Sequence, residues 1–443
     1  MELHEVKADK SFYSGSSPSN INENFMGEIE HDNISFSHGV DADDSKRGSS
    51  FLAYFNIVCV VAGTGALSLP YALKQGGWIG LFILGLSWFF STYSGVILIR
   101  CLYYNGKTRL SSYQEVAEEA FGKIGGWLAF FFTVISLIGV PVLYILLAGS
   151  NLHSVCAGTS AELTFPIWVV ICSAVVAVPF VFFKSMKDVG VLSAFGMLAT
   201  VVVVLICLVM AAIDRPNQTN VHHDSVIWSE FPVALSSIVF SFGGNPVYAH
   251  VEAGMRRPRD WPKVITAGLS TCAILYFLTA IPGYYVYGNQ VMSPVYNSIP
   301  AGGAKIASEI VITAHVLMAC PILLTSFALD LEKMFGINSF RFSRVVEHTL
   351  RFILRIVLVV IIAVIAIYVP FFGDFLSLLG AFSNCTLILI FPVIFYLKLT
   401  GVRNKHFTEL ILCAIIVLIG VVGLIFGTKS AVEALKSDFE SSS

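Results

Sequence analysis

The chain has 443 residues, of which 56% are hydrophobic and 13% are charged, and its formal net charge is -2. Soluble globular proteins carry about 25% charged residues, so this chain holds too little charge to cover a water-exposed surface. Lipid must be the solvent for most of its surface, which excludes a soluble enzyme and a disordered chain. The small net charge also excludes an electrostatic field that would attract nucleic acid.

The first fifty residues differ from the rest in composition. They hold fourteen charged residues among Ser, Asn and Gly, and they show no apolar periodicity. A segment of this kind cannot bury enough apolar surface to fold, so residues 1–50 are predicted to be a disordered tail. No apolar stretch begins near Met1, so we do not expect a signal peptide.

From Phe51 onward, apolar runs long enough to cross about 30 Å of hydrocarbon recur between short charged loops. Lipid offers backbone groups no hydrogen bonds, so these runs must be helices, whereas a closed barrel would show short alternating segments. The sequence predicts an all-α membrane protein, with a transmembrane domain at 51–427 and a short C-terminal tail at 428–443. The eleven predicted transmembrane helices are 51–73, 77–100, 126–152, 165–183, 189–213, 231–253, 264–287, 306–329, 352–370, 374–397 and 408–427.

The 27 Lys and Arg residues divide unevenly between the two sets of loops. The set that includes the N-terminal tail holds 22 of them, and the other set holds five. Basic residues concentrate on the cytoplasmic side of membranes, so the N-terminus is predicted to be cytosolic and the C-terminus to lie outside or in a lumen. The kind of membrane stays open between a vacuolar or lysosomal type and the plasma membrane.

A glycosylation signal provides an independent check on this orientation. Asn217 begins the sequence Asn-Gln-Thr in the loop after the fifth predicted helix. Such signals can be used only on the non-cytosolic side, where the predicted orientation places this loop. Asn217 is therefore a candidate for N-glycosylation.

The first predicted helix is interrupted at mid-membrane depth by Gly63-Thr64-Gly65, with Pro70 shortly after. Relative to Ala, each Gly costs a helix about 1 kcal/mol and Pro about 3 kcal/mol. Such a break is tolerated where the freed backbone is buried in protein or lines a cavity. Free amides at the break, backed by the positive end of the following half-helix, suit a substrate carboxylate. The alternative is close helix packing through small residues.

The sixth predicted helix carries Gly243-Gly244 and Pro246 at the corresponding depth. Paired interruptions in matching helices of two halves indicate a transporter site built from inverted repeats. We expect helices one to five and six to ten to form the two repeats, with the eleventh outside them. A channel or a seven-helix receptor predicts neither this helix count nor this pairing.

The order and spacing of these motifs resemble the amino acid/auxin permeases, over about Phe51 to Gly427. The resemblance implies a LeuT-like fold, with a 5+5 inverted repeat plus one helix, and transport of amino acids or related solutes coupled to protons or sodium. The matching residues are Gly63, Gly65, Leu67, Pro70 and Tyr71 in the first helix, SYQEVAEEAFG at Ser112 to Gly122, FSFGGNPVYAHVEAGM at Phe240 to Met255 with Pro258 beyond it, YYVYG at Tyr284 to Gly288, and FFGDFLSLLGAF at Phe371 to Phe382.

The resemblance also implies where a substrate binds. Amides at the first break would hold its carboxylate, and carbonyls at the second break would receive its ammonium group. The implied residues are Gly63, Thr64, Gly65 and Ala66 for the carboxylate, and Phe240, Ser241 and Gly243 for the ammonium group. Side-chain specificity would fall to the pocket neighbours Tyr144, Asn245, Tyr248 and Phe382, although aromatic residues in helices more often serve packing.

Candidates for ion coupling fall into two groups. Within the spans, His315 is the deepest ionisable residue, and imidazole titrates nearest physiological pH. Glu252 is a second protonatable candidate, closer to a helix end. Sodium needs oxygen ligands, and Thr325 and Ser326 could supply hydroxyls, although such groups often bond back to their own helix. In sodium-coupled members of the resembled family an Asn stands where this chain has Cys59, which argues against sodium.

We therefore expect a secondary active transporter of L-amino acids, coupled to protons, with alternating access around the two breaks. The alternatives are sodium-coupled amino acid transport and an amino-acid sensor or receptor that uses the same pocket. No motif for nucleotide binding, metal hydrolysis or nucleophilic catalysis is present, so we expect neither enzymatic activity nor a cofactor or metal site. Partner proteins are not specified by the sequence, and no nucleic-acid partner is expected.

Overall fold

The computed structural model describes residues 48–106, 108–182, 186–337, 341–369, 372–403 and 405–442. The predicted disordered tail at 1–50 lies outside the described residues except for its last three. The helices are α1 Ser50–Val61, α2 Thr64–Gly76, α3 Ile79–Leu102, α4 Tyr113–Cys156, α5 Phe165–Phe182, α6 Met186–Asp214, η3 Arg215–Asn217, α7 Phe231–Ser241, α8 Asn245–Ala253, η4 Pro258–Asp260, α9 Trp261–Tyr287, η5 Gly288–Gln290, η6 Val295–Ser298, α10 Gly303–Met334, α11 Arg344–Tyr368, α12 Phe372–Leu379, η7 Gly380–Ile390, α13 Phe391–Thr400, α14 Phe407–Val422, η8 Gly423–Gly427 and α15 Thr428–Ser442.

Among the described residues, nine helices are each long and apolar enough to cross a membrane. The pair α1 and α2, bent by 41° at their junction, makes a tenth span if it is taken as one. The predicted run at 231–253 consists of α7 and α8, with 11 and 9 residues. Neither reaches the roughly 20 residues that a helix needs to cross the hydrocarbon core. The all-helical membrane fold is therefore confirmed, and the predicted count of eleven spans is not.

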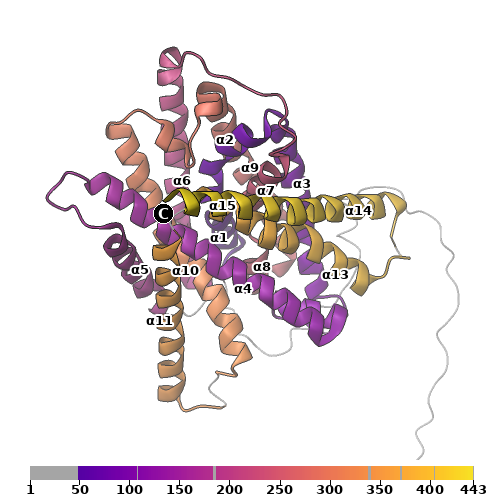
Figure 1. The fold of residues 1–443 in the computed structure, drawn as a ribbon. Helices are drawn as coiled ribbons and strands as arrows, with labels where there is room; N and C mark the ends of the chain where they lie inside the picture. Colours follow the sequence, from indigo (N-terminus) through magenta and orange to yellow (C-terminus); the bar gives the residue numbers. More distant parts are fainter. Residues whose placement is uncertain are drawn as a thin grey trace, which may run out of the picture. The chain divides into compact units, whose positions relative to one another are not determined.

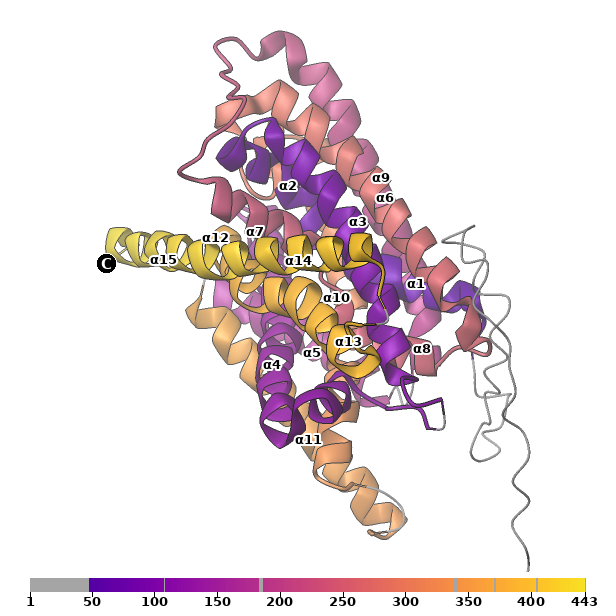
Figure 2. The same ribbon diagram turned by 90° about the vertical axis from the view of Figure 1, so that its right-hand side faces the viewer.

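Helical structure extends beyond two of the predicted spans. Helix α4 begins at Tyr113, ahead of the apolar run, and turns sharply at Gly122, whose φ of 68° lies in the left-handed region that favours glycine. At the other end of the chain, α14, η8 and α15 form one continuous rod that runs through Ser442 (Figure 2). The predicted tail at 428–443 is thus helical in its described part.

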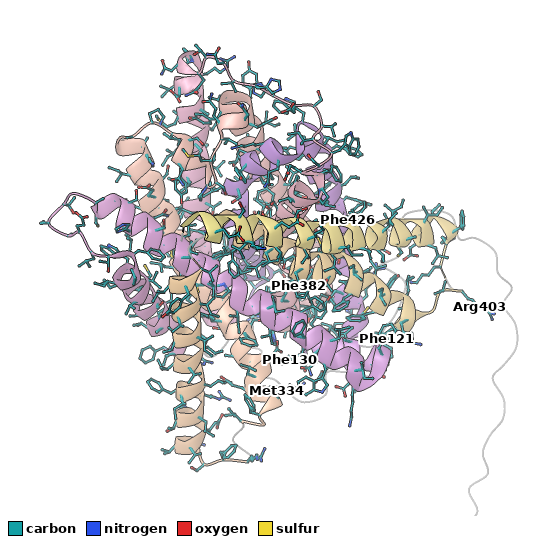
Figure 3. The ribbon with its side chains drawn as sticks, in the orientation of Figure 1. Phe121, Phe130, Met334, Phe382, Arg403 and Phe426 are labelled. Carbon is teal, nitrogen blue, oxygen red and sulfur yellow. The ribbon has the colours of Figure 1, made fainter. Side chains whose placement is uncertain are left out.

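The broken helices lie at the centre of the bundle. Helix α1 packs against α6 and α9, and α2 packs against α7 and α9. Helix α10 packs against both α4 and α6, while α4, α5 and α11 lie side by side farther out (Figure 1). Many large apolar side chains are exposed on the helices α5, α6, α11 and α14. Phe121 and Phe426 are also exposed (Figure 3). Lipid would cover such a surface.

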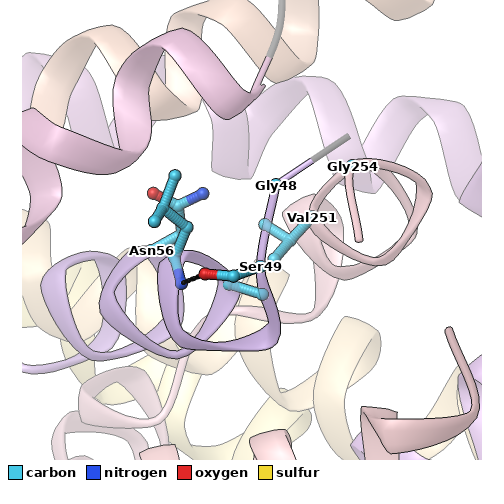
Figure 4. A pocket seen from close by; sticks show the side chains of 7 residues that line it. Gly48, Ser49, Asn56, Val251 and Gly254 are labelled. Atoms are coloured by element: carbon cyan, nitrogen blue, oxygen red, sulfur yellow. Dashed lines mark hydrogen bonds between the residues drawn. The ribbon is translucent and has the colours of Figure 1, made fainter. Parts of the chain in front are cut away.

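The chain just before α1 pairs with the end of the second broken helix. The Gly48 amide donates to the Gly254 carbonyl at 2.8 Å, and the Arg256 amide donates to the Gly48 carbonyl at 2.8 Å. A shallow pocket lies beside this bridge, and the Ser49 side chain caps α1 there by accepting from the Leu52 amide (Figure 4). The start of α1 and the end of α8 are therefore tied together by backbone hydrogen bonds.

Candidate substrate and ion site

The first predicted break is present in the structure. Helix α1 ends at Val61, and α2 begins at Thr64, so Ala62 and Gly63 separate the two half-helices. The ψ of Gly63 is -127°, which is far from helical. Pro70 then lies inside α2. The freed backbone is buried in protein, since Ala62 and Thr64 are both nearly inaccessible, which is the condition for tolerating a break at this depth.

The second predicted break is also present. Helix α7 ends at Ser241, α8 begins at Asn245, and Phe242, Gly243 and Gly244 lie between them. Pro246 occupies the first turn of α8, where its missing N–H costs no hydrogen bond. Glycine and proline therefore mark both the end of one half-helix and the start of the next.

The two breaks contact each other. A methyl group added to Gly65 would lie 2.7 Å from the Ser241 Cα atom and 2.9 Å from its Cβ atom. Non-bonded carbon atoms pack at about 3.5–4.0 Å, so only a residue without a side chain allows α2 to approach α7 this closely. The positive N-terminal end of α2 and the negative C-terminal end of α7 thus face the same small region.

Tyr276 on α9 joins both breaks, and sequence reasoning missed it. Its hydroxyl lies 2.6 Å from the Val61 carbonyl oxygen and also hydrogen-bonds with the Ser241 carbonyl oxygen. The side chain is fully buried. Nothing in the local sequence separates Tyr276 from the other aromatic residues of an apolar helix, so its role depends on tertiary packing that the sequence does not display.

Two predicted side chains reach the first break. The Tyr144 hydroxyl donates to the Val60 carbonyl at 3.3 Å. A methyl group on Gly63 would lie 2.8 Å from the Tyr144 hydroxyl and 3.1 Å from Nε2 of His315. The predicted pocket neighbour on α4 and the predicted proton carrier on α10 therefore meet at Gly63.

His315 is fully buried, and its two ring nitrogens have different surroundings. Nδ1 lies 2.8 Å from the Gly196 carbonyl oxygen and 2.9 Å from the Thr200 hydroxyl, both on α6. A carbonyl oxygen only accepts, so Nδ1 carries the proton in this arrangement. Nε2 has no hydrogen-bond partner among the described residues. Its lone pair is unused, and the atom lies beside Gly63 at the first break.

The predicted residues of the second break are held mainly by α3 and by the segment η7. The Asn245 side-chain amide donates to the Ser94 hydroxyl at 3.1 Å and to the Leu387 carbonyl at 3.2 Å, while its Oδ1 has no partner among the described residues. Tyr248 lies beside the break, because a methyl group on Gly244 would lie 2.7 Å from its hydroxyl. Asn245 and Tyr248 thus lie at the second break.

Some predicted binding groups already have intramolecular partners. The Phe240 carbonyl accepts from the Gly243 amide at 2.9 Å, and the Ala66 amide donates to the Gly63 carbonyl at 3.3 Å. The ring of Phe382 packs against Phe132 on α4, with ring centroids 5.0 Å apart (Figure 3). Phe382 therefore contacts α4, and no described contact brings it to either break.

Glu252 is completely buried and paired. Arg109, in the loop between α3 and α4, contacts its Oε2 at 2.6 Å, and the Tyr103 hydroxyl donates to its Oε1 at 2.6 Å. Burial, together with the Glu252 carboxylate, raises the pKa of Tyr103, so the phenol stays protonated and donates. The ion pair ties the loop to α8, and it leaves Glu252 less suited to carry a transported proton.

Thr325 and Ser326 on α10 are fully buried, and their hydroxyls have no hydrogen-bond partner among the described residues. They do not bond back to their own helix, which was one of the two expectations for them. Within the described part of the chain, no group of three or more His, Cys, Asp and Glu residues could hold a metal ion. Asn217 is exposed in η3, and its side-chain amide donates to Asp214 at 3.1 Å.

Proteins of similar sequence are named as amino acid transporters. The amino acid transporter AVT1E of Arabidopsis thaliana is 28% identical over 87% of this chain and 73% of that protein. AVT1J of the same plant is 27% identical over 87% of this chain and 91% of its own length. The vesicular inhibitory amino acid transporter of Xenopus tropicalis is 26% identical over 88% of this chain and 78% of its own length.

Solved transporters share the fold. Mhp1, a nucleobase-cation-symport-1 family transporter in a closed conformation, matches with a TM-score of 0.57 at 15% identity, over 88% of this chain and 93% of that chain. A Na+-coupled sialic acid symporter matches with a TM-score of 0.56 at 12% identity, over 88% and 92% of the two chains. At these identities the likeness establishes the fold alone.

The helical bundle with two abutting broken helices is a multi-pass membrane protein with the fold of LeuT-like transporters such as Mhp1. Residues 46–432 match the family described as transmembrane amino acid transporter protein. The chain belongs to this family, which confirms the family predicted from its motifs.

Proposed function

We propose that the protein is a secondary active transporter of neutral or broadly specific L-amino acids, driven by a proton gradient. One observation carries this proposal: the breaks meet where Gly65 contacts Ser241. The amide end of α2 suits a carboxylate, and the carbonyl end of α7 suits an ammonium group. These two helix ends lie close to each other, and the carboxylate and ammonium groups of an α-amino acid are also close to each other. Alternating access would then proceed by movement of the half-helices around this point.

His315 is the proposed proton carrier. It is fully buried at the first break, and the lone pair of its Nε2 has no partner among the described residues. A proton arriving there would place a positive charge close to the α1–α2 junction. Glu252 is a poorer candidate, because its carboxylate is paired with Arg109. Buried ionisable groups inside spans commonly mark ion pathways.

The orientation and membrane form a further part of the proposal. The 22 to 5 division of basic residues supports a cytosolic N-terminus. The frog relative is named a vesicular transporter, which favours an intracellular membrane over the plasma membrane.

Uptake into proteoliposomes tests the main proposal. Full-length protein would be reconstituted, and uptake of a radiolabelled equimolar mixture of the twenty L-amino acids would be measured under imposed pH gradients, with and without sodium. We expect the rate of uptake to increase with the imposed pH gradient and to be the same with and without sodium. Binding without net flux would support the sensor alternative instead, and absence of both would refute amino acid recognition.

Sodium coupling is the second candidate, because Thr325 and Ser326 present two buried hydroxyls without partners among the described residues. Hydroxyl oxygens are ligands that a hard cation accepts. This candidate predicts uptake that needs sodium and persists without a pH gradient. It further predicts that Thr325→Val raises the sodium concentration required for half-maximal uptake.

A further inference from the structure

The Tyr276 hydroxyl occupies the point where the carbonyl ends of both broken helices converge. Val61 is the last residue of α1, and Ser241 is the last residue of α7. The Tyr276 hydroxyl lies 2.6 Å from the Val61 oxygen and within hydrogen-bond distance of the Ser241 oxygen. The Val61 and Ser241 carbonyl oxygens therefore share one hydroxyl group, that of Tyr276.

A phenol cannot satisfy both carbonyls at once. Its hydroxyl carries one proton, and each carbonyl oxygen only accepts. One of the two oxygens therefore always faces the hydroxyl oxygen without a proton between them. Both carbonyls also end half-helices, where the helix dipole is negative. The two carbonyl oxygens therefore have fewer donor protons than they can accept, and their negative helix ends favour a positive charge.

A primary ammonium group supplies what this arrangement lacks. It brings three N–H donors and a positive charge, and charge-assisted hydrogen bonds are about twice as strong as neutral ones. An ammonium group that binds here must displace the Tyr276 hydroxyl from at least one of the carbonyls. The hydroxyl and the substrate therefore compete for the same acceptors.

We propose that Tyr276 is a positioning residue of the ammonium subsite. While the site is empty, its hydroxyl holds the Val61 and Ser241 carbonyls together by hydrogen bonding. When an amino acid binds, its ammonium group replaces the hydroxyl at these carbonyls. The inference rests on the proposed function and adds a residue to it. The Tyr276 hydroxyl then stabilises the substrate-free transporter and contributes little to the stability of the substrate-bound transporter. Transport steps that occur without bound substrate should depend on the hydroxyl, and steps that occur with bound substrate should not.

Two transport modes separate these steps. Net uptake requires the empty site to return across the membrane, whereas exchange of internal for external amino acid uses only the loaded site. Both would be measured in the same proteoliposomes, with the L-amino acid that wild-type protein takes up fastest from the labelled mixture as the probe. The ratio of exchange to net uptake is independent of how much folded protein each preparation contains.

For Tyr276→Phe, which keeps the ring and removes the hydroxyl, we expect the ratio of exchange to net uptake to rise about fivefold, as loss of one buried hydrogen bond would give. The KM for exchange should fall, because the ammonium group no longer competes with a hydroxyl. Tyr284→Phe, which removes another buried hydroxyl from α9, should leave the ratio unchanged. If Tyr276→Phe fails to fold, Tyr276→Met also lacks the hydroxyl and should show the same rise.

A purely structural role would lower exchange and net uptake by the same factor and leave the ratio at its wild-type value. That result, or a raised KM for exchange, would overturn the inference about Tyr276 while leaving amino acid transport intact. A wild-type protein that neither binds nor transports any of the twenty amino acids would overturn the proposed function and this inference together.

Discussion

Gly65 and Ser241 lie so close together that a single added methyl group on the glycine would fall 2.7 Å from the Cα atom of the serine. Gly65 lies in the first turn of the second half of one broken helix, and Ser241 ends the first half of the other. Their contact joins the two breaks that the sequence marks with Gly and Pro. The geometry of the site therefore depends on the absence of a side chain at position 65.

Gly65→Ala should abolish most of the transport. Overpacking a site of this kind costs about 1–3 kcal/mol, so we expect uptake to fall by about tenfold or more as the half-helices separate. The measurement is initial uptake into proteoliposomes, normalised to folded protein. Gly85→Ala on α3 is the matched control, because nothing lies within 4 Å of the added methyl group there. Full activity in Gly65→Ala would mean that the breaks do not form the substrate site.

His315→Gln should uncouple transport from protons. Glutamine can occupy part of the same space and still donate to the Gly196 carbonyl, but it cannot take up a proton at physiological pH. We expect uptake that no longer responds to an imposed pH gradient, while exchange of amino acid persists. His348→Gln on α11 changes an exposed histidine and should keep the wild-type response. A normal pH response in His315→Gln would exclude this residue as the proton carrier.

The positions of the breaks could be predicted from sequence because Gly and Pro disrupt a helix locally. The partners of the predicted residues could not. Glu252 meets Arg109 across 143 positions of the chain, and Tyr276 meets Val61 across 215. Such pairs are set by how helices pack, and an apolar periodic sequence is compatible with many packings. The contact of Phe382 with Phe132 on α4 is a further example, since the aromatic character of Phe382 alone does not predict which helix it packs against.

The exact number of spans is not confirmed, for a related reason. Hydropathy measures how apolar a run is and does not show how its backbone divides, whereas Gly and Pro in the run at 231–253 predicted the break within it. In the structure this run is two helices of 11 and 9 residues. The helical setting of Thr325 and Ser326 favoured hydroxyls that bond back to their own helix, and these hydroxyls have no hydrogen-bond partner among the described residues.

Thr325→Val should distinguish the two coupling ions. A buried hydroxyl without a hydrogen-bond partner destabilises the folded state. Replacing it with a methyl group should therefore leave the melting temperature unchanged or raise it slightly. With proton coupling, uptake and its pH dependence should stay at wild-type levels. Ser326→Ala should behave in the same way. Uptake that falls and is rescued by high sodium would show instead that these hydroxyls hold the cation.

Asn217 should carry carbohydrate when the protein is made in eukaryotic cells. The residue is exposed, and the predicted orientation places its loop on the non-cytosolic side. We expect a mobility shift on gels after treatment with an N-glycosidase. Both Asn217→Gln and Thr219→Ala should remove this shift, the second without altering the Asn217 side chain. Asn33 begins a second glycosylation signal, Asn-Ile-Ser, in the predicted cytosolic tail. Carbohydrate attached there instead would invert the proposed orientation.

Arg109→Met should destabilise the protein more than the double variant Arg109→Met/Glu252→Met. The Glu252 carboxylate is completely buried, and it accepts from Arg109 and from Tyr103. Removing one partner of a buried ion pair leaves a charge without compensation, at a cost of about 3–5 kcal/mol. Replacing both partners with apolar side chains removes that charge, so part of the loss should be recovered.

Thermal unfolding of the purified full-length protein in detergent would measure both variants. Arg344→Met, in the first turn of α11, is the control for loss of an exposed arginine and should change little. With Glu252→Met measured as the second single variant, the difference between the double variant and the sum of the two single variants gives the coupling energy of the pair. If the single and double variants melt together, the Glu252 carboxylate does not depend on Arg109 for the stability of the folded protein. Glu252 would then return as a proton-carrying candidate beside His315.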